Sequence, residues 1–233
     1  MAARKMHVAP ISWRLASDLF GVALVSSSAA TINQVLEHNA DARMLRTRNR
    51  PLPAKRMNVP AAAITGTLVG LAGVALLAFG NNPLTAILAV LTALSYAFIY
   101  TPLKSKSPIS TFIGAFPGAM PAVLGWTAVT AKLDWEALSL FAIGFFWQFP
   151  HFMSIVWIYR EDYARASYLV LPHDEKAIAR IVNWQTLLPL LLLASVSLLP
   201  ALTSKRVDKT RFLAFPGAQG LLVWRHGRQR RKT

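Results

Sequence analysis

The chain has 233 residues, of which 54% are hydrophobic and only 15% are charged. A soluble globular domain has about a quarter of its residues charged, so this composition excludes an ordinary soluble fold. The net charge of +15 would also suit a nucleic-acid partner, but basic residues in so hydrophobic a chain more often set membrane topology. There is no cysteine, which excludes disulfides and thiolate metal sites. The composition therefore predicts a polytopic membrane protein.

Apolar segments recur along the chain, and most are close to the roughly 20 residues that cross a bilayer. The six candidate spans fall at about 15–32, 60–80, 84–102, 111–130, 137–158 and 181–202. The first is the weakest, because Asp18 interrupts it and its VSSSAA string also fits a signal-peptidase site. We retain it as a span.

Basic residues are unevenly divided between the two sides of the predicted spans. The loops at 33–59, 103–110 and 159–180 carry twelve Lys and Arg residues, against four on the opposite side. The positive-inside rule therefore places these three loops in the cytoplasm. Nine more basic residues follow position 203, where six spans would put them outside, against the same rule.

The loop after the first span combines acids, an amide and arginines in the string NQVLEHNADARMLRTRNRP. Asn33, Glu37 and Asp41 are spaced i, i+4 and i+8, so they share one face of a helix. Such hard oxygen ligands suit Mg²⁺, which completes its shell with water and phosphate oxygens. These residues are therefore candidate metal ligands.

A run of arginines follows this acidic face at once. Arg43, Arg46, Arg48 and Arg50 are able to hold a diphosphate through bidentate contacts. The plain alternative is a solvated cap that only fixes the orientation of the first helix.

Tyrosines and lysines mark the cytoplasmic end of the third span, in YAFIYTPLKSKSPIST. Tyr96 and Tyr100 lie one turn apart, followed by Lys104 and Lys106. An interfacial aromatic belt with snorkelling lysines explains this pattern. If the loops converge, Lys104 adds charge to a diphosphate site while the tyrosine rings face an allylic cation.

Small residues recur in the fourth span, where Gly114, Gly118 and Ala122 have four-residue spacing with Pro117 and Pro121 between them. Their main predicted role is close helix packing. Kinks at the prolines would also open a cavity.

The fifth span carries polar residues at membrane depth, in FFWQFPHFMSIVWIYREDYARASYLVLP. A polar side chain there is costly unless it faces a cavity or a partner, which makes His151 a candidate site residue. The alternative is a histidine that hydrogen-bonds within the bundle. Just beyond the span, Asp162 supplies a further carboxylate on the side of Glu37 and Asp41.

Three strings together resemble the UbiA-type intramembrane prenyltransferases, and specifically the haem-modifying branch of that family. They are NQVLEHNADARMLRTRNRPLP, YTPLKSKSPISTFIGAFPGAMPAVLGW and WQFPHFMSIVWIYREDYARASYLVLP. The resemblance covers about residues 15–200. It implies an all-α bundle around a central cavity, in a bacterial inner membrane, with prenyl diphosphate bound through Mg²⁺ at the cytoplasmic side.

The resemblance also implies a reaction and its partners. A vinyl group of haem b would attack the farnesyl cation from farnesyl diphosphate, water would add, and diphosphate would leave. Membrane lipid surrounds such a protein, haem A synthase or terminal oxidase assembly would be its neighbours, and nucleic acid is not a partner.

Carried over by position, the resemblance assigns roles to named residues. The catalytic and metal-binding set is Asn33, Glu37, Asp41 and Asp162. The substrate-binding set is Arg43, Arg46, Arg50, Tyr100, Lys104, His151 and Tyr163, with His151 as a hypothetical haem contact.

The sequence also departs from the family pattern. Ser105 replaces a second basic residue, and Ser167 replaces the glycine that usually follows the DYARA string. The family has about nine spans, and the pattern stops after Thr203, so we expect a prenyltransferase domain at 1–203 and an atypical basic tail at 204–233. A frameshifted or truncated reading frame would explain this, and predicts an unstable or inactive copy.

Two other functions remain open from the sequence. One is the same chemistry with a quinone precursor as acceptor, against which the WQFPHF string argues. The other is a non-catalytic membrane component, either a carrier for an anionic lipid or a partner in oxidase assembly. A carrier is expected to show inverted repeats, and none is apparent.

Overall fold

The computed structural model describes residues 11–107, 109–168 and 175–198. All secondary structure within these residues is helical, which confirms the all-α prediction. In chain order the elements are α1 (Ile11–Asp41), α2 (Val59–Gly80), α3 (Pro83–Leu94), the π-helix η1 (Ser95–Tyr100), α4 (Thr101–Leu103), α5 (Ser110–Thr130), α6 (Trp135–Ile158), α7 (Arg160–Arg165) and α8 (Glu175–Val196). The predicted tail at 204–233 and the domain boundary at 203 lie outside the described residues.

Five helical segments are long and apolar enough to cross a membrane. They are Trp13–Asp41, Val59–Gly80, Pro83–Leu103, Ser110–Thr130 and Trp135–Ile158. The first predicted span is thus one continuous helix that contains the VSSSAA string. The sixth predicted span lies on α8, whose described apolar part, Arg180–Val196, is shorter than the others.

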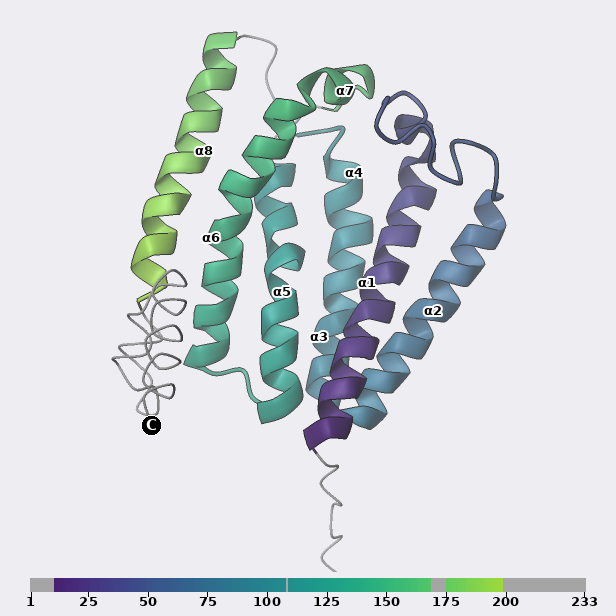
Figure 1. Cartoon of the computed structure of the whole chain (residues 1–233), viewed down its shortest axis with the longest axis vertical. Coiled ribbons are helices and arrows are strands. Elements are labelled where there is room, and N and C mark those ends of the chain that lie inside the picture. The colour runs from purple at the N-terminus through teal and green to yellow at the C-terminus, as the bar shows by residue number, and fades with distance from the viewer. Residues whose placement is uncertain (1–10, 108, 169–174, 199–233) are drawn as a thin grey trace, which may run out of the picture.

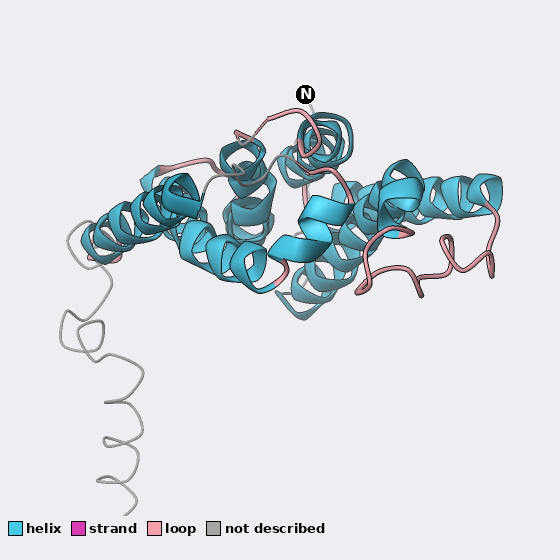
Figure 2. Cartoon of the chain, turned by 90° about the horizontal axis from the view of Figure 1, so that it is seen from above, coloured by secondary structure: helices cyan, strands magenta, loops and turns pink. Residues whose placement is uncertain are grey.

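The long helices lie side by side, with α2 and α8 at opposite edges (Figure 1). The α1–α2, α4–α5 and α6–α7 connections all lie at one end of the bundle, at the top of Figure 1. Figure 2 shows this loop end from above. The three polar loops that were predicted to share one side therefore lie at the same end of the bundle, and the opposite end holds the short α2–α3 and α5–α6 turns.

Helix starts follow from capping residues in the sequence. The side chains of Asn58, Asn82 and Asp134 accept hydrogen bonds from the first turns of α2, α3 and α6, respectively. Proline follows Asn58 and Asn82 within the first helical turn, where its missing N–H costs no helical hydrogen bond. These caps fix where the loop residues begin.

Small residues let the helices approach closely. A Cβ on Gly73 of α2 would lie 2.8 Å from the Leu24 Cβ of α1. In α5, a Cβ on Gly114 would lie 2.5 Å from the Tyr100 ring, and one on Gly118 only 2.2 Å from the Gln148 amide. The predicted packing role of the α5 glycines is confirmed. The third position of that motif, Ala122, is exposed.

Candidate functional site

The C-terminal half of α1 presents a polar face to the bundle. Asn33, Glu37 and Asp41 are 7%, 8% and 1% exposed, which confirms that one helix face buries all three. The Asn33 amide donates to Glu37 Oε2 at 2.9 Å and to the Thr101 hydroxyl at 2.9 Å. The predicted acidic face is thus tied to α4.

Two cations from other segments pair with this acidic face. The Lys104 ammonium lies 3.0 Å from both carboxylate oxygens of Glu37, with good hydrogen-bond geometry only at Oε2. The Arg50 guanidinium lies 2.9 Å from Asp41 Oδ2. Lys104 follows the end of α4 and Arg50 lies on the α1–α2 loop, so both cations are able to turn toward a bound anion.

Asp162 at the start of α7 holds the α1–α2 loop in place. Its carboxylate accepts from the backbone N–H groups of Leu45 at 3.1 Å and Arg46 at 3.3 Å, and it pairs with Arg165. The Arg165 hydrogen bond, followed by the two backbone donors, holds the Asp162 pKa below its usual value although burial opposes this. Asp162 therefore stays ionised and clamps the first loop to the third.

Two tyrosines lead from the ion pairs into the bundle. The π-helical turn η1 carries Tyr96 and Tyr100, whose ring centroids are 5.4 Å apart. The Lys104 ammonium lies 4.6 Å from the centroid of the Tyr100 ring. Widened turns of this kind are often found at functional sites. Lys104, Tyr100 and Tyr96 form a line from the charged end toward the interior.

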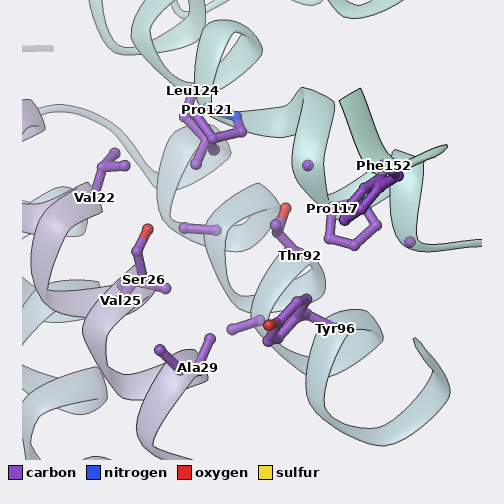
Figure 3. Close-up of a pocket in the computed structure, with 15 residues that line it drawn as sticks. Val22, Val25, Ser26, Ala29, Thr92, Tyr96, Pro117, Pro121, Leu124 and Phe152 are labelled. Carbon is purple, nitrogen blue, oxygen red and sulfur yellow. The ribbon is translucent and has the colours of Figure 1, made fainter. Parts of the chain in front are cut away.

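An apolar cavity of about 210 Å³ lies within the bundle (Figure 3). Its walls come from α1, α3, η1, α5 and α6, and Tyr96 and Ala29 lie at the end opposite Val22 and Leu124. The remaining lining residues include Val22, Val25, Ser26, Ala29, Ala30, Ala89, Thr92, Pro117, Pro121, Leu124 and Phe152. Both predicted α5 prolines line it. The cavity therefore suits an apolar chain whose polar head remains at the ion pairs.

The other predicted arginines do not reach the acidic face. Arg43 and Arg48 are exposed. The Arg46 guanidinium stacks 4.7 Å from the centroid of the Tyr159 ring. Burial raises the pKa of the neighbouring Tyr163, although the charge of Arg46 opposes this. Arg43 and Arg46 thus border the site, whereas Arg50 is part of it.

His151 lies exposed on α6, and its ring stacks on Trp147 with a centroid separation of 4.8 Å. Neither residue lines the cavity described above, which α6 reaches through the next residue, Phe152. Among the described residues, His151 has no hydrogen-bond partner within the bundle. Its predicted contact with haem stays a prediction.

Tyr168 lies beside the acidic face and was missed by the sequence reasoning. Its ring is 9% exposed and packs with Met44, Val156 and Ala166, while its buried hydroxyl has no hydrogen-bond partner among the described residues. Burial first, then the charge of Glu37, raises its pKa, so the hydroxyl keeps its proton. Tyr168 is therefore a buried, protonated donor that lies beside the Glu37 carboxylate.

The backbone before Tyr168 explains why the sequence pattern did not predict this residue as part of the site. Ser167 has φ of 60°, in the left-handed region, and this turn reverses the chain after α7 to direct Tyr168 inward. No helical periodicity marks a residue placed by such a turn. The replacement of the usual glycine by Ser167 was the available signal.

The predicted metal site is not formed as a ready cluster. In the described part of the chain, no three His, Asp or Glu side chains lie close enough together to hold a metal ion. Glu37 and Asp41 are paired with Lys104 and Arg50, and Asp162 is taken up by backbone donors. The assignment of Mg²⁺ to Asn33, Glu37, Asp41 and Asp162 stays a prediction.

A helical bundle with ion pairs above an apolar cavity defines a membrane protein that is suited to an amphipathic anionic substrate. The whole chain, residues 1–233, matches the UbiA prenyltransferase family. The chain belongs to that family.

Relatives from several bacteria carry the name protoheme IX farnesyltransferase. The chain is 47% identical to the protein from Koribacter versatilis, over 82% of the chain and 63% of the relative. It is 44% identical to that of Cytophaga hutchinsonii, over 76% and 63%, and 43% identical to that of Solibacter usitatus, over 81% and 64%. The matches thus span less than two thirds of each relative. No solved structure matches the chain.

Proposed function

We propose that this protein transfers a farnesyl group from farnesyl diphosphate to a vinyl group of protohaem IX, giving haem O and diphosphate. The observation that carries the proposal is the combination of the Lys104–Glu37 and Arg50–Asp41 pairs at the loop end with an apolar cavity within the bundle. A prenyl diphosphate has the same division into a charged head and an apolar tail. The names of the relatives support farnesyl as the tail and protohaem as the acceptor.

The charged end would bind the diphosphate. Lys104 and Arg50 provide cations, and Tyr168 provides a buried neutral donor that keeps its proton. In this arrangement the three groups stabilise the negative charge that develops on the departing diphosphate, which is where electrostatic catalysis is most effective. Tyr163 and Arg46 border the same space.

The chemistry of Glu37, Asp41 and Asn33 fits a Mg²⁺ ion once Lys104 and Arg50 turn away from the two carboxylates. Glu37 Oε1 is buried without a hydrogen bond, and Glu37 and Asp41 provide two carboxylates on one face, with the Asn33 amide beside them. A bound Mg²⁺ would neutralise phosphate charge. Asp162 would contribute indirectly, because its hydrogen bonds hold the loop that carries Arg50.

In the proposed reaction, the bond between farnesyl C1 and the diphosphate oxygen breaks, and both electrons leave with diphosphate. The haem vinyl carbon forms a bond to C1, and water adds to the resulting haem cation with loss of one proton. Tyr96 and Tyr100 lie between the charged end and the cavity, where their ring faces would stabilise the allylic cation.

The acceptor side is proposed to include His151. Its exposed imidazole, stacked on Trp147, is free to contact an aromatic macrocycle or its iron. His151→Ala should then shift the haem Soret band or weaken haem affinity, with prenyl diphosphate binding little changed. An unaltered spectrum together with unaltered affinity would assign His151 a structural role.

The loop end is proposed to face the cytoplasm of a bacterial inner membrane. The three converging loops carry the excess of Lys and Arg, as the positive-inside rule requires. Haem A synthase or oxidase assembly factors would be its neighbours, because they receive the product.

A direct assay tests the proposed function. Membranes that contain the protein are incubated with haem b, farnesyl diphosphate and Mg²⁺, and haem O is measured by chromatography. Parallel samples contain a quinone precursor in place of haem b, or the Asp41→Asn variant. Haem O formation that depends on Asp41 supports the proposal. Prenylation of the quinone precursor alone, or no product at all, contradicts it.

A further inference from the structure

The apolar cavity has a closed floor in the middle of the bundle. Following α1 and α3 away from the loop end, and α5 toward its C-terminus, the last lining residues are Val22, Ala89 and Leu124. Figure 3 shows Val22 and Leu124 at the end opposite Tyr96 and Ala29. Ala89 and Leu124 are 0% and 3% exposed and belong to a packed cluster that also contains Val25, Leu77 and Ala86. Tight packing thus seals this end.

The depth of the site can be measured along α1. Glu37 at the charged end and Val22 at the floor are 15 positions apart on one continuous helix. At about 1.5 Å per residue this separation is about 22 Å. That length accommodates a diphosphate followed by three extended isoprene units, but leaves no room for a fourth.

A carboxylate lies immediately under the floor. A Cβ on Gly125 would be 3.7 Å from Asp18 Oδ2, so the acid sits beside the residue that follows Leu124. Asp18 Oδ1 is buried and has no hydrogen-bond partner among the described residues. A prenyl tail that passed Leu124 would bury its methyl groups against this polar group and remove its remaining hydration, which is unfavourable.

We infer that Leu124, with Val22 opposite it, sets the length of the prenyl chain that the enzyme accepts. This inference rests on the proposed function, since it concerns the tail of the same prenyl diphosphate. Leu124 is the largest side chain of the floor, and it lies between the cavity and the Asp18 carboxylate. Shortening it extends the cavity toward Asp18, and enlarging it shortens the cavity.

The test measures donor preference in membranes that contain the protein. Values of kcat/KM are compared for geranyl, farnesyl and geranylgeranyl diphosphate with haem b as acceptor. Leu124→Ala should raise the geranylgeranyl-to-farnesyl ratio at least tenfold, and Leu124→Phe should raise the geranyl-to-farnesyl ratio by a similar factor. Val22→Ala should act in the same direction as Leu124→Ala, but more weakly. Opposite shifts in two variants of one residue do not result from general instability.

Leu91→Ala is the matched control, because Leu91 lies on α3 with 57% of its surface exposed and does not line the cavity. Its donor preference should equal that of the wild type. If the wild type uses farnesyl diphosphate and neither Leu124 variant changes the ratios, the inference is wrong while the proposed function stands. If no prenyl diphosphate supports turnover in the wild type, the proposed function itself fails.

Discussion

The two ends of the bundle satisfy their polar groups in different ways. At the loop end, ion pairs join segments that are distant in sequence, such as Lys104 with Glu37. At the opposite end, the groups around Thr127 are neutral and bond to each other and to the backbone, while the nearby Asp18 carboxylate keeps one buried oxygen without a hydrogen bond. The Asn82 amide donates to the Thr127 carbonyl at 2.8 Å, and the Thr85 hydroxyl donates to the Thr127 hydroxyl at 3.0 Å.

This difference separates a binding site from a structural joint. The neutral bonds around Thr127 are buried and leave their donors fully used, so they hold α3 against α5 and offer nothing to a ligand. The charged pairs at the loop end include a buried oxygen on Glu37 without a hydrogen bond, and the protonated Tyr168 hydroxyl lies beside the same carboxylate. Changes at the loop end should therefore affect turnover, whereas changes at the other end should affect stability.

The largest effect is expected for Asp41→Asn. The substitution keeps the shape of the side chain but removes the charge that pairs with Arg50 and is proposed to hold Mg²⁺. Loss of one preorganised electrostatic group typically lowers kcat by about 10²- to 10³-fold. Haem O formation is measured in membranes, with haem affinity as the control that should be unchanged. Full activity in this variant, or in the presence of EDTA, would rule out the metal site.

Lys104→Met should have the next largest effect. A charge-assisted hydrogen bond contributes about 1.5–3 kcal/mol, which corresponds to a rise in KM for farnesyl diphosphate of about 10- to 100-fold. Steady-state kinetics at varied farnesyl diphosphate measures this. Lys106→Met is the matched control, because Lys106 is exposed and forms no ion pair among the described residues. Equal KM values for the two variants would remove Lys104 from the site.

A smaller change is expected for Tyr168→Phe, which removes only the buried hydroxyl beside Glu37. A neutral hydrogen bond contributes about 0.5–1.5 kcal/mol, so the affinity for inorganic diphosphate should fall about 2- to 10-fold. Because the hydroxyl makes no hydrogen bond of good geometry, thermal stability should be little changed. A loss of stability with normal diphosphate affinity would instead show that Tyr168 supports Glu37 structurally.

Sequence reasoning located the acidic face because it depends on local spacing, and it placed the three polar loops on one side from the distribution of Lys and Arg. The four-residue spacing of Asn33, Glu37 and Asp41 fixes a common helix face whatever surrounds it. The all-α bundle and five of its spans likewise follow from the length of the apolar runs. These features required no knowledge of tertiary contacts.

Other features of the site depend on contacts that spacing does not encode. The path of the α1–α2 loop decides which arginine reaches Asp41. That path is set by the hydrogen bonds that Asp162 accepts from the backbone N–H groups of the loop. Tyr168 is placed by one left-handed residue. His151 could be recognised as polar at membrane depth, but its direction depends on how α6 packs between α5 and α8.

At the opposite end of the bundle, Thr127→Val should change stability and not turnover. The variant keeps the volume of the side chain and removes the hydrogen bonds that the Thr127 hydroxyl makes with the Thr85 hydroxyl and the Leu124 carbonyl, at a cost of about 1 kcal/mol. Thermal unfolding in detergent measures this loss, and haem O formation at low temperature should equal that of the wild type. A selective loss of turnover would contradict the division between the two ends.

The smallest effect is expected for Ser167→Gly at the loop end. A left-handed backbone destabilises a non-glycine residue by about 1–2 kcal/mol, and glycine avoids this cost. Glycine also has more conformational entropy in the unfolded chain, which lowers the stability of the folded protein by about 0.4–1 kcal/mol. With φ of 60° at Ser167, the two terms leave a net stabilisation of about 0.5 kcal/mol. Ser105→Gly is the matched control, because Ser105 is not among the described residues with positive φ and should lose stability. If both glycine variants were destabilised, strain at Ser167 would be excluded, and the position of Tyr168 would need another explanation.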